Sequence, residues 1–151
     1  MNLSSNLNLH VYLADDDADD RFLFEEALKE VVNNVKLTTV DNGEQLMNFL
    51  GKQTPPTPHL IFLDLNMPLK NGMECLDEIK SNSKLKNIPV VIFSTSCQKE
   101  AIDKVYKNGA DFYICKPDNF QTLKSLLDRV FALNSNDLLT RPSREDFLIS
   151  V

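Results

Sequence analysis

Residues 60–64 read Leu-Ile-Phe-Leu-Asp, a run of four apolar residues that ends in a carboxylate. Residues 11–14 (Val-Tyr-Leu-Ala) and 90–93 (Val-Val-Ile-Phe) form two similar runs, and the first of these is also followed by aspartate. Nearly continuous hydrophobicity over such short stretches is typical of strands that are covered on both faces, as in a parallel sheet. We therefore expect segment 60–64 to be a buried strand of a parallel sheet.

Outward from this run, strand-like and helix-like segments alternate along the chain. Apolar residues recur at helical spacing between the runs, and in the first such segment they are Phe22, Ala27, Leu28 and Val31. Five strand–helix pairs in succession predict an α/β fold built on a five-stranded parallel sheet. The expected strands are Leu9 to Ala14, Val35 to Val40, His59 to Asp64, Pro89 to Ser94 and Asp111 to Cys115. The expected helices cover residues 18–30, 44–50, 73–79, 99–107 and 119–133.

Length and composition restrict the classes of protein to consider. The 151 residues suit one ordinary domain, expected over 7–133, followed by a tail over 134–151 that is partly disordered or forms a docking arm. A net charge of −6 argues against a nucleic-acid surface, which needs a basic footprint. No apolar run approaches the roughly 20 residues of a membrane span, and no signal peptide is evident, so we expect a cytoplasmic protein without membrane contact. Three cysteines without paired spacing predict free thiols.

Polar side chains of complementary chemistry follow four of the expected strands. Asp15-Asp16-Asp17 follows the first, Asp64 ends the third, Ser94-Thr95-Ser96 ends the fourth, and Lys116 follows the fifth. In an open parallel sheet the carboxyl ends of the strands lie at one edge, where functional groups gather. We therefore expect acids, a hydroxyl and an amine to meet there.

The types of residue in this group indicate phosphoryl chemistry. Neighbouring carboxylates repel one another unless a cation lies between them, and an all-oxygen cluster favours Mg²⁺ over Zn²⁺. Asp64 can act as a nucleophile, because aspartate forms acyl phosphates. The Lys116 ammonium and the Ser94 hydroxyl can then stabilise the phosphoryl oxygens.

Four spaced motifs resemble those of response-regulator receiver domains of two-component signalling. They are L-A-D-D-D at 13–17, L-I-F-L-D-L-N-M-P-L-K-N-G at 60–72, P-V-V-I-F-S-T-S at 89–96 and Y-I-C-K-P at 113–117. The resemblance runs from about Leu9 to Leu133 and is further similar to the stand-alone subgroup that serves phytochrome-type and hybrid kinases. It implies a doubly wound, flavodoxin-like sheet of order 2-1-3-4-5, the order that the chemotaxis receiver of this family exemplifies.

The resemblance also implies roles for individual residues. Asp64 is expected to be the phosphoacceptor, and Asp15 and Asp16 to hold Mg²⁺ together with the main-chain carbonyl of Asn66. Ser94 takes the position of the hydroxyl residue, often Thr in the family, and Tyr113 takes that of the rotameric switch. On phosphorylation Ser94 should move toward the phosphoryl group, and Tyr113 should fill the space that it leaves.

The same resemblance implies the partners. A sensor histidine kinase or a histidine phosphotransfer protein should supply the phosphoryl group, and the chain should lose it again by hydrolysis, as a switch rather than an enzyme with a diffusible substrate. Output is expected through protein contacts made by the receiver itself. We expect a monomer–dimer equilibrium that phosphorylation shifts toward a homodimer through the fourth helix, fifth strand and fifth helix, which Phe147, Leu148 and Ile149 of the tail could cover or swap across.

Other readings of the acidic motif fit less well. An EF-hand loop starting at Asp15 would place Asp20 where a sharp turn needs glycine. A phosphatase of the haloacid-dehalogenase type needs Thr or Val where Asp19 stands, and a cap domain besides. A flavin mononucleotide carrier needs a phosphate-binding loop after the first strand, whereas the three aspartates at 15–17 would repel a phosphate there. A degenerate receiver that only binds partners would lack the acceptor or the acidic pair, and both are present.

Overall fold

The computed structural model describes residues 9–52, 57–133 and 140–151. Residues 7 and 8 of the expected domain and 134–139 of the expected tail lie outside this part of the chain. The strands are β1 (Leu9–Ala14), β2 (Val35–Val40), β3 (Leu60–Leu63), β4 (Val90–Ser94) and β5 (Phe112–Cys115). The helices are α1 (Ala18–Val31), α2 (Gly43–Leu50), α3 (Gly72–Ser81), α4 (Lys99–Lys107), α5 (Phe120–Phe131) and the short α7 (Arg144–Phe147).

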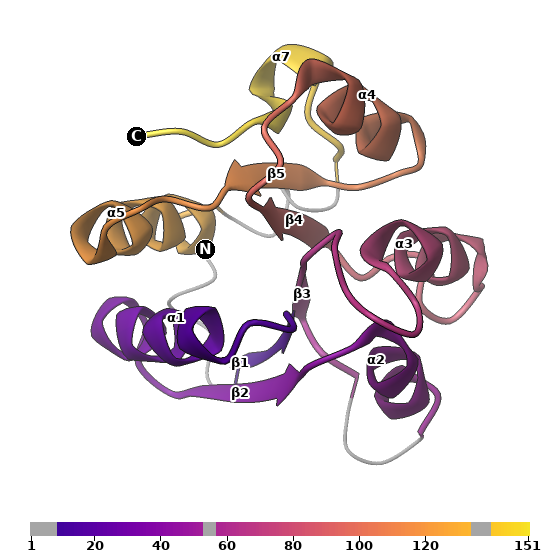
Figure 1. Cartoon of the computed structure of the whole chain (residues 1–151), viewed down its shortest axis with the longest axis horizontal. Helices are drawn as coiled ribbons and strands as arrows, with labels where there is room; N and C mark the ends of the chain where they lie inside the picture. Colours follow the sequence, from indigo (N-terminus) through magenta and orange to yellow (C-terminus); the bar gives the residue numbers. More distant parts are fainter. Residues whose placement is uncertain (1–8, 53–56, 134–139) are drawn as a thin grey trace.

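The five strands form one sheet of order β2-β1-β3-β4-β5, and all the pairings are parallel. Helices α1 and α5 cover one face, and α2, α3 and α4 cover the other (Figure 1). Strands β1, β3 and β4 are buried along their whole length, as their apolar sequences require. The predicted fold class and strand order are confirmed.

Each face of the sheet carries its own hydrophobic core, because alternate residues of a strand point to opposite faces. On the α1/α5 face, Phe62 of β3 packs edge-on against Phe24 of α1 at a centroid distance of 4.8 Å. On the other face, Ile61 and Leu63 of β3 join the cluster that includes Leu76 of α3. The sheet is thus fixed from both sides, which holds the carboxyl ends of its strands rigidly.

Side-chain caps start the helices at defined residues. Asp17 accepts from the backbone amides of Asp19 and Asp20 at the start of α1. Asn71 forms a capping box with Glu74 at the start of α3. Such caps satisfy amides that have no partner within the helix and typically contribute about 1 kcal/mol each. They set where each loop at the carboxyl edge of the sheet ends.

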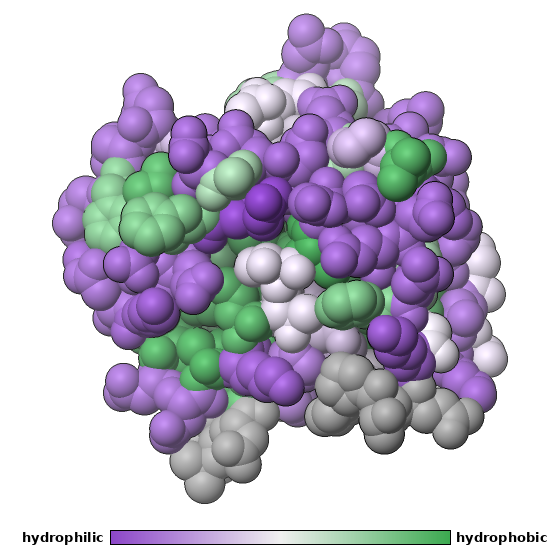
Figure 2. All heavy atoms as spheres, turned by 60° about the horizontal axis from the view of Figure 1, so that its bottom comes forward, coloured by the Kyte–Doolittle hydropathy of each residue, from purple (hydrophilic) through white to green (hydrophobic). Residues whose placement is uncertain are grey.

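The expected apolar stripe of the first helix is wrong at Phe22. The Phe22 side chain is 64% exposed, and the buried residues of α1 are Phe24, Ala27 and Leu28. Because each residue advances by about 100°, Phe22 lies about 160° around the helix from the buried Phe24, and it therefore faces solvent. Apolar side chains (green) also gather on one side of an otherwise mostly hydrophilic face in Figure 2, which brings the bottom of Figure 1 forward.

The described part of the tail, residues 140–151, packs against α4 and β5. Phe147 is fully buried, with its ring 5.0 Å from that of Tyr106 in α4 and 6.1 Å from that of Tyr113 in β5. The amide of Ile149 donates to the Tyr113 carbonyl at 2.9 Å, and Leu148 forms a parallel bridge with Tyr113. Figure 1 shows α7 beside α4, beyond the edge strand β5.

The expectation of three free thiols is wrong for two of them. Cys97 and Cys115 form a disulfide between the loop after β4 and the end of β5, with a Cα–Cα distance of 5.7 Å. Their separation of 18 residues follows no familiar spacing, and they meet because β4 and β5 are neighbours in the sheet. Cys75 of α3 is free and buried.

Candidate functional site

Asp64 and Asp15 meet because β3 and β1 are neighbours with matched ends. Ala14 pairs with Leu63 in the register of the two strands, so the residue after each strand lies at the same edge. The Asp64 amide donates to the Ala14 carbonyl at 2.9 Å, and both aspartates are buried. Buried carboxylates at the end of two apolar strands are costly unless they are paired or bind a cation.

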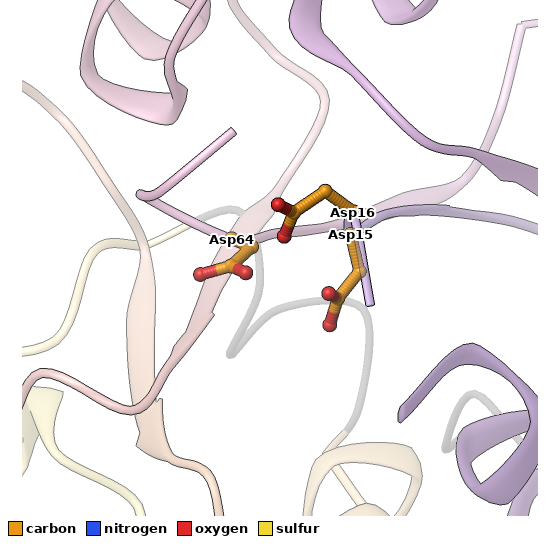
Figure 3. A group of neighbouring side chains, drawn as sticks. All are labelled: Asp15, Asp16 and Asp64. Atoms are coloured by element: carbon orange, nitrogen blue, oxygen red, sulfur yellow. The ribbon is translucent and has the colours of Figure 1, made fainter. Parts of the chain in front are cut away.

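Asp16 completes a group of three carboxylates. One oxygen from each of Asp15, Asp16 and Asp64 lies within 4.8 Å of the others. Figure 3 shows the carboxylates gathered around one space, with Asp15 and Asp16 on the segment that follows β1 and Asp64 at the end of β3. Asp16 is exposed whereas the other two are buried, so the group opens to solvent on the side of Asp16.

Lys116 lies against this group as its nearest positive charge. Its ammonium is 2.8 Å from Asp15 Oδ2 and 3.2 Å from Asp64 Oδ2. Burial alone would lower the pKa of Lys116, but the neighbouring carboxylates outweigh burial and hold the pKa above its ordinary value. The lysine is therefore charged at physiological pH.

One ammonium does not compensate for the buried acids. Burial raises the pKa of Asp15 to about 6, although Lys116 and the Asp17 amide favour the charged form. Burial likewise raises the pKa of Asp64, and Lys116 offsets the shift only in part. One close ammonium leaves the negative charge of the three carboxylates only partly compensated. Their all-oxygen donor set fits a hard divalent cation, which would relieve the repulsion among them.

Ser94 and Tyr113 lie beside the acids on the next two strands. Ser94 is buried at the end of β4, and its hydroxyl oxygen accepts from the Ser96 amide at 3.1 Å. The Tyr113 hydroxyl donates to the Ser96 carbonyl, which ties β5 to the loop after β4. Burial raises the pKa of Tyr113, so its hydroxyl keeps its proton and can donate.

Asn66 follows Asp64 on the exposed loop before α3. Its amide lies 3.4 Å from Asp64 Oδ1, a long hydrogen bond to the carboxylate. The loop then returns to the site at Gly72, where a Cβ atom would lie only 2.1 Å from the Asp64 carbonyl oxygen. Only glycine fits this approach of α3 to the backbone of Asp64.

The structure adds one residue that the sequence analysis did not assign to the site. Asp20 Oδ2 lies 2.9 Å from the Lys116 ammonium, which also contacts Asp15 and Asp64 of the acidic group. Asp20 lies in the first turn of α1, whereas Asp16 precedes that helix, so helical spacing gives no signal that Asp20 belongs to the site. Within the described residues, the structure thus brings Asp15, Asp16, Asp64, Lys116 and Asp20 together, and it places Ser94 and Tyr113 on the two strands beyond β3.

Comparison with known proteins identifies the family. Residues 11–128 match the model of the response regulator receiver domain. The chain belongs to this family. It is 34% identical over 134 residues to the response regulator Rcp1 of Synechocystis sp., covering 86% of this chain and 91% of that relative.

Two solved structures are similar in both sequence and fold. The Mn(2+)-bound form of response regulator Rcp1 superimposes with a TM-score of 0.77 at 33% identity, covering 89% of this receiver and 99% of that chain. The phosphorylated cyanobacterial phytochrome response regulator RcpA gives a TM-score of 0.78 at 35% identity, covering 90% and 99%. The expected resemblance to the phytochrome-type subgroup is thereby confirmed.

Membership defines the activity of this receiver. It is a phospho-acceptor of two-component signalling, phosphorylated on aspartate by way of a histidine kinase, and a signalling protein rather than a catalyst. Its three aspartates form the acidic metal site of such a protein. No helix in the described part of the chain is long and apolar enough to cross a membrane.

Proposed function

We propose that Asp64 is the residue of this receiver that accepts the phosphoryl group. The observation that supports this assignment is that the buried Asp64 carboxylate lies close both to Asp15 and Asp16 and to Lys116, whose ammonium is 3.2 Å away. Asp15 and Asp16, with the main-chain carbonyl of Asn66, would hold Mg²⁺. The ion would neutralise charge on the phosphoryl oxygens during transfer.

The chain's own residues account for the rest of the transfer step. An Asp64 oxygen attacks phosphorus, an oxygen–phosphorus bond forms, and the bond from phosphorus to the donor's imidazole nitrogen breaks. The carboxylate needs no general base because it is already ionised in the charged site. Lys116 and Ser94 then donate to the phosphoryl oxygens, which stabilises the charge that reaches Asp64.

The same residues would convert phosphorylation into a change of surface. When Ser94 turns toward the phosphoryl group, its hydrogen bond with the Ser96 amide is lost and Tyr113 can move inward. Tyr113 contacts both the loop after β4 and Phe147 of the tail. Its movement would therefore change the surface that α4, β5 and the tail form. Ser94 and Tyr113 thus form the proposed switch.

The donor is a sensor histidine kinase acting directly or a histidine phosphotransfer protein. A hollow of about 270 Å³ beside the site suits its docking, because it is lined by Lys116 together with Leu23 of α1 and Phe120 at the start of α5. Leu23 is 42% exposed, and neighbouring Phe22 is more exposed still. Apolar side chains beside the phosphoacceptor can seat a helical partner.

Output by protein contact, in the cytoplasm and without binding of nucleic acid, completes the proposal. The net charge of −6 supports the exclusion of nucleic acid. Phosphorylation-linked homodimerisation through α4, β5 and α5 would have to involve the tail, because residues 147–149 already cover part of that face. The receiver domain at 7–133 and the tail at 134–151 would then act as one unit.

The assignment is tested by labelling the protein with acetyl phosphate and Mg²⁺. We expect a base-labile acyl phosphate in the wild type and none in Asp64→Asn. Asp19→Asn is the matched control, because the Asp19 side chain is exposed and the residue bonds the Asp17 cap through its backbone amide, which the substitution keeps. Labelling that persists in Asp64→Asn would refute the assignment.

A further inference from the structure

Two of the three cysteines meet at the edge of the sheet that carries the phosphoryl site. Cys115 is the last residue of β5, and Cys97 lies in the loop that follows β4. Their Cα atoms are 5.7 Å apart, within the range of roughly 4.4–6.8 Å that a disulfide requires. Cys97 is exposed, so small molecules in solution can reach it.

The third cysteine provides a contrast within the same chain. Cys75 is fully buried in the core on the other face, where its thiol donates to the Gly43 carbonyl. Burial raises the pKa of Cys75 to about 11, so the reactive thiolate is scarce at physiological pH. Oxidation chemistry is therefore confined to Cys97 and Cys115.

The position of the pair relates it directly to the switch. Cys97 follows Ser96, which contacts both Ser94 through its amide and Tyr113 through its carbonyl. Cys115 precedes Lys116 of the acidic group. The disulfide thus joins the loop that must follow Ser94 to the strand that carries Tyr113 and Lys116.

We propose that Cys97 and Cys115 are a reversible redox modification site, oxidised by a hydroperoxide, whose disulfide opposes phosphorylation of the receiver. A chain of this length that buries two full cores does not need a disulfide in order to fold. Pairs of this kind in a reducing compartment are usually redox-sensing. Because the two cysteines lie beside Ser94 and Tyr113, the state of their disulfide can regulate the proposed switch.

The oxidation balances with one hydroperoxide for each pair. The Cys97 thiolate attacks one oxygen of the O–O bond and becomes a sulfenic acid, while the other oxygen leaves as an alcohol or water after taking a proton. The Cys115 thiol then attacks the sulfenic sulfur, and the disulfide forms with release of water. Two electrons pass from the sulfurs to the peroxide, and a dithiol reductant returns them.

The effect on phosphorylation rests on the proposed Ser94–Tyr113 switch. A disulfide keeps the two Cα atoms within a narrow range of distances, whereas two thiols allow the loop to move away from β5. The phosphorylated conformation requires that loop to move with Ser94. Because coupling between two sites is reciprocal, a bond that disfavours the phosphorylated conformation also disfavours phosphorylation.

The test compares the full-length protein after treatment with hydrogen peroxide and after treatment with dithiothreitol. Peptide mass spectrometry should show a Cys97–Cys115 link only in the oxidised sample, and thiol titration in denaturant should fall from three thiols to one. Labelling by acetyl phosphate and Mg²⁺ should then be slower by about fivefold or more in the oxidised protein. Dithiothreitol should restore the rate.

Cys97→Ser is the matched variant, since position 97 is exposed and serine leaves the fold intact. It should label at the rate of the reduced wild type in both samples, which excludes damage by peroxide elsewhere. Failure of the link to form, or equal labelling rates in the linked and reduced protein, overturns the redox site and leaves the phosphoacceptor assignment standing. Absence of labelling even in the reduced protein overturns both proposals.

Discussion

The ammonium of Lys116 contacts Asp20 Oδ2 at 2.9 Å and, at the same time, Asp15 Oδ2 of the acidic group at 2.8 Å. A divalent cation bound by the three clustered carboxylates would compete with Lys116 for Asp15 and Asp64. Asp20 gives the ammonium an acidic partner when it leaves them. Asp20 is thus a positioning residue for Lys116.

We predict that Asp20→Asn weakens Mg²⁺ binding by on the order of fivefold, or about 1 kcal/mol. Without Asp20 the ammonium stays with the clustered carboxylates, and the ion must displace it at greater cost. A calorimetric titration of the protein with Mg²⁺ measures the dissociation constant of the ion. Asp19→Asn removes the same charge from the same turn of α1 without touching Lys116, so it should bind Mg²⁺ nearly as the wild type does. Equal losses in the two variants would mean that only long-range charge matters.

The raised pKa of Asp15 predicts how pH affects the metal site. In the folded, metal-free protein the pKa of Asp15 is about 6, above the ordinary value for aspartate. Protonation of Asp15 therefore stabilises the folded state relative to the unfolded state, and this stabilisation is lost as the pH rises through about 6. An ion that binds the ionised form must compete with that proton at low pH. The increase in Tm on adding Mg²⁺ should therefore be larger at about pH 7.5 than at about pH 5. The same increase at both values would contradict the assignment of Asp15 as a ligand.

Gly72 is predicted to be essential for the geometry of Asp64. An alanine Cβ there would lie 2.1 Å from the Asp64 carbonyl oxygen and 2.7 Å from the Leu65 Cα, and backbone atoms cannot move aside cheaply. We expect Gly72→Ala to lower the free energy of unfolding by about 3 kcal/mol and to slow labelling of Asp64. Urea denaturation measures the first effect.

Gly51→Ala is the matched control for this substitution. Gly51 ends α2 with right-handed helical angles (φ −76°, ψ −12°), and the nearest atom to an added Cβ is 3.4 Å away. Alanine there should be neutral or stabilising by about 0.5 kcal/mol, since it reduces the entropy of the unfolded chain. If Gly72→Ala were no worse than Gly51→Ala, the close approach of α3 to Asp64 would not constrain the site.

The alternation of buried runs and helical segments predicted an α/β fold with a parallel sheet, whereas the strand order came from the resemblance of four motifs to receiver domains. The sequence also placed Asp15, Asp64, Ser94 and Lys116 together, since residues that follow parallel strands share one edge of the sheet. Contacts between residues that are distant in the sequence and share no strand or helix periodicity could not be predicted from the sequence. The disulfide joins the loop after β4 to the end of β5, and Lys116 contacts Asp20, which is 96 positions earlier in the chain.

Burial of the tail is the other feature that the sequence left open. The apolar residues at 147–149 are consistent with either a loose end or a docked arm, and the polar residues before them break the helical pattern. The structure docks this segment through one aromatic ring, that of Phe147, between Tyr106 and Tyr113. Substitution of Phe147 therefore tests whether the tail stays docked.

We predict that Phe147→Ala releases the segment that follows Pro142. Arg141 lies with its guanidinium over the Tyr106 ring at 4.2 Å and donates to the Ala110 carbonyl, and Arg144 pairs with Asp103 at 2.6 Å. These half-exposed contacts contribute little by themselves, whereas loss of a buried phenylalanine costs about 3 kcal/mol. Without the ring, Arg144 should become accessible to trypsin, and the rate of cleavage between Arg144 and Glu145 should rise by at least about tenfold, whereas trypsin does not cleave between Arg141 and Pro142. Val151→Ala, at a position that is 70% exposed, should leave the rate unchanged. Cleavage of Phe147→Ala at the wild-type rate would show that the polar contacts hold the tail without the ring.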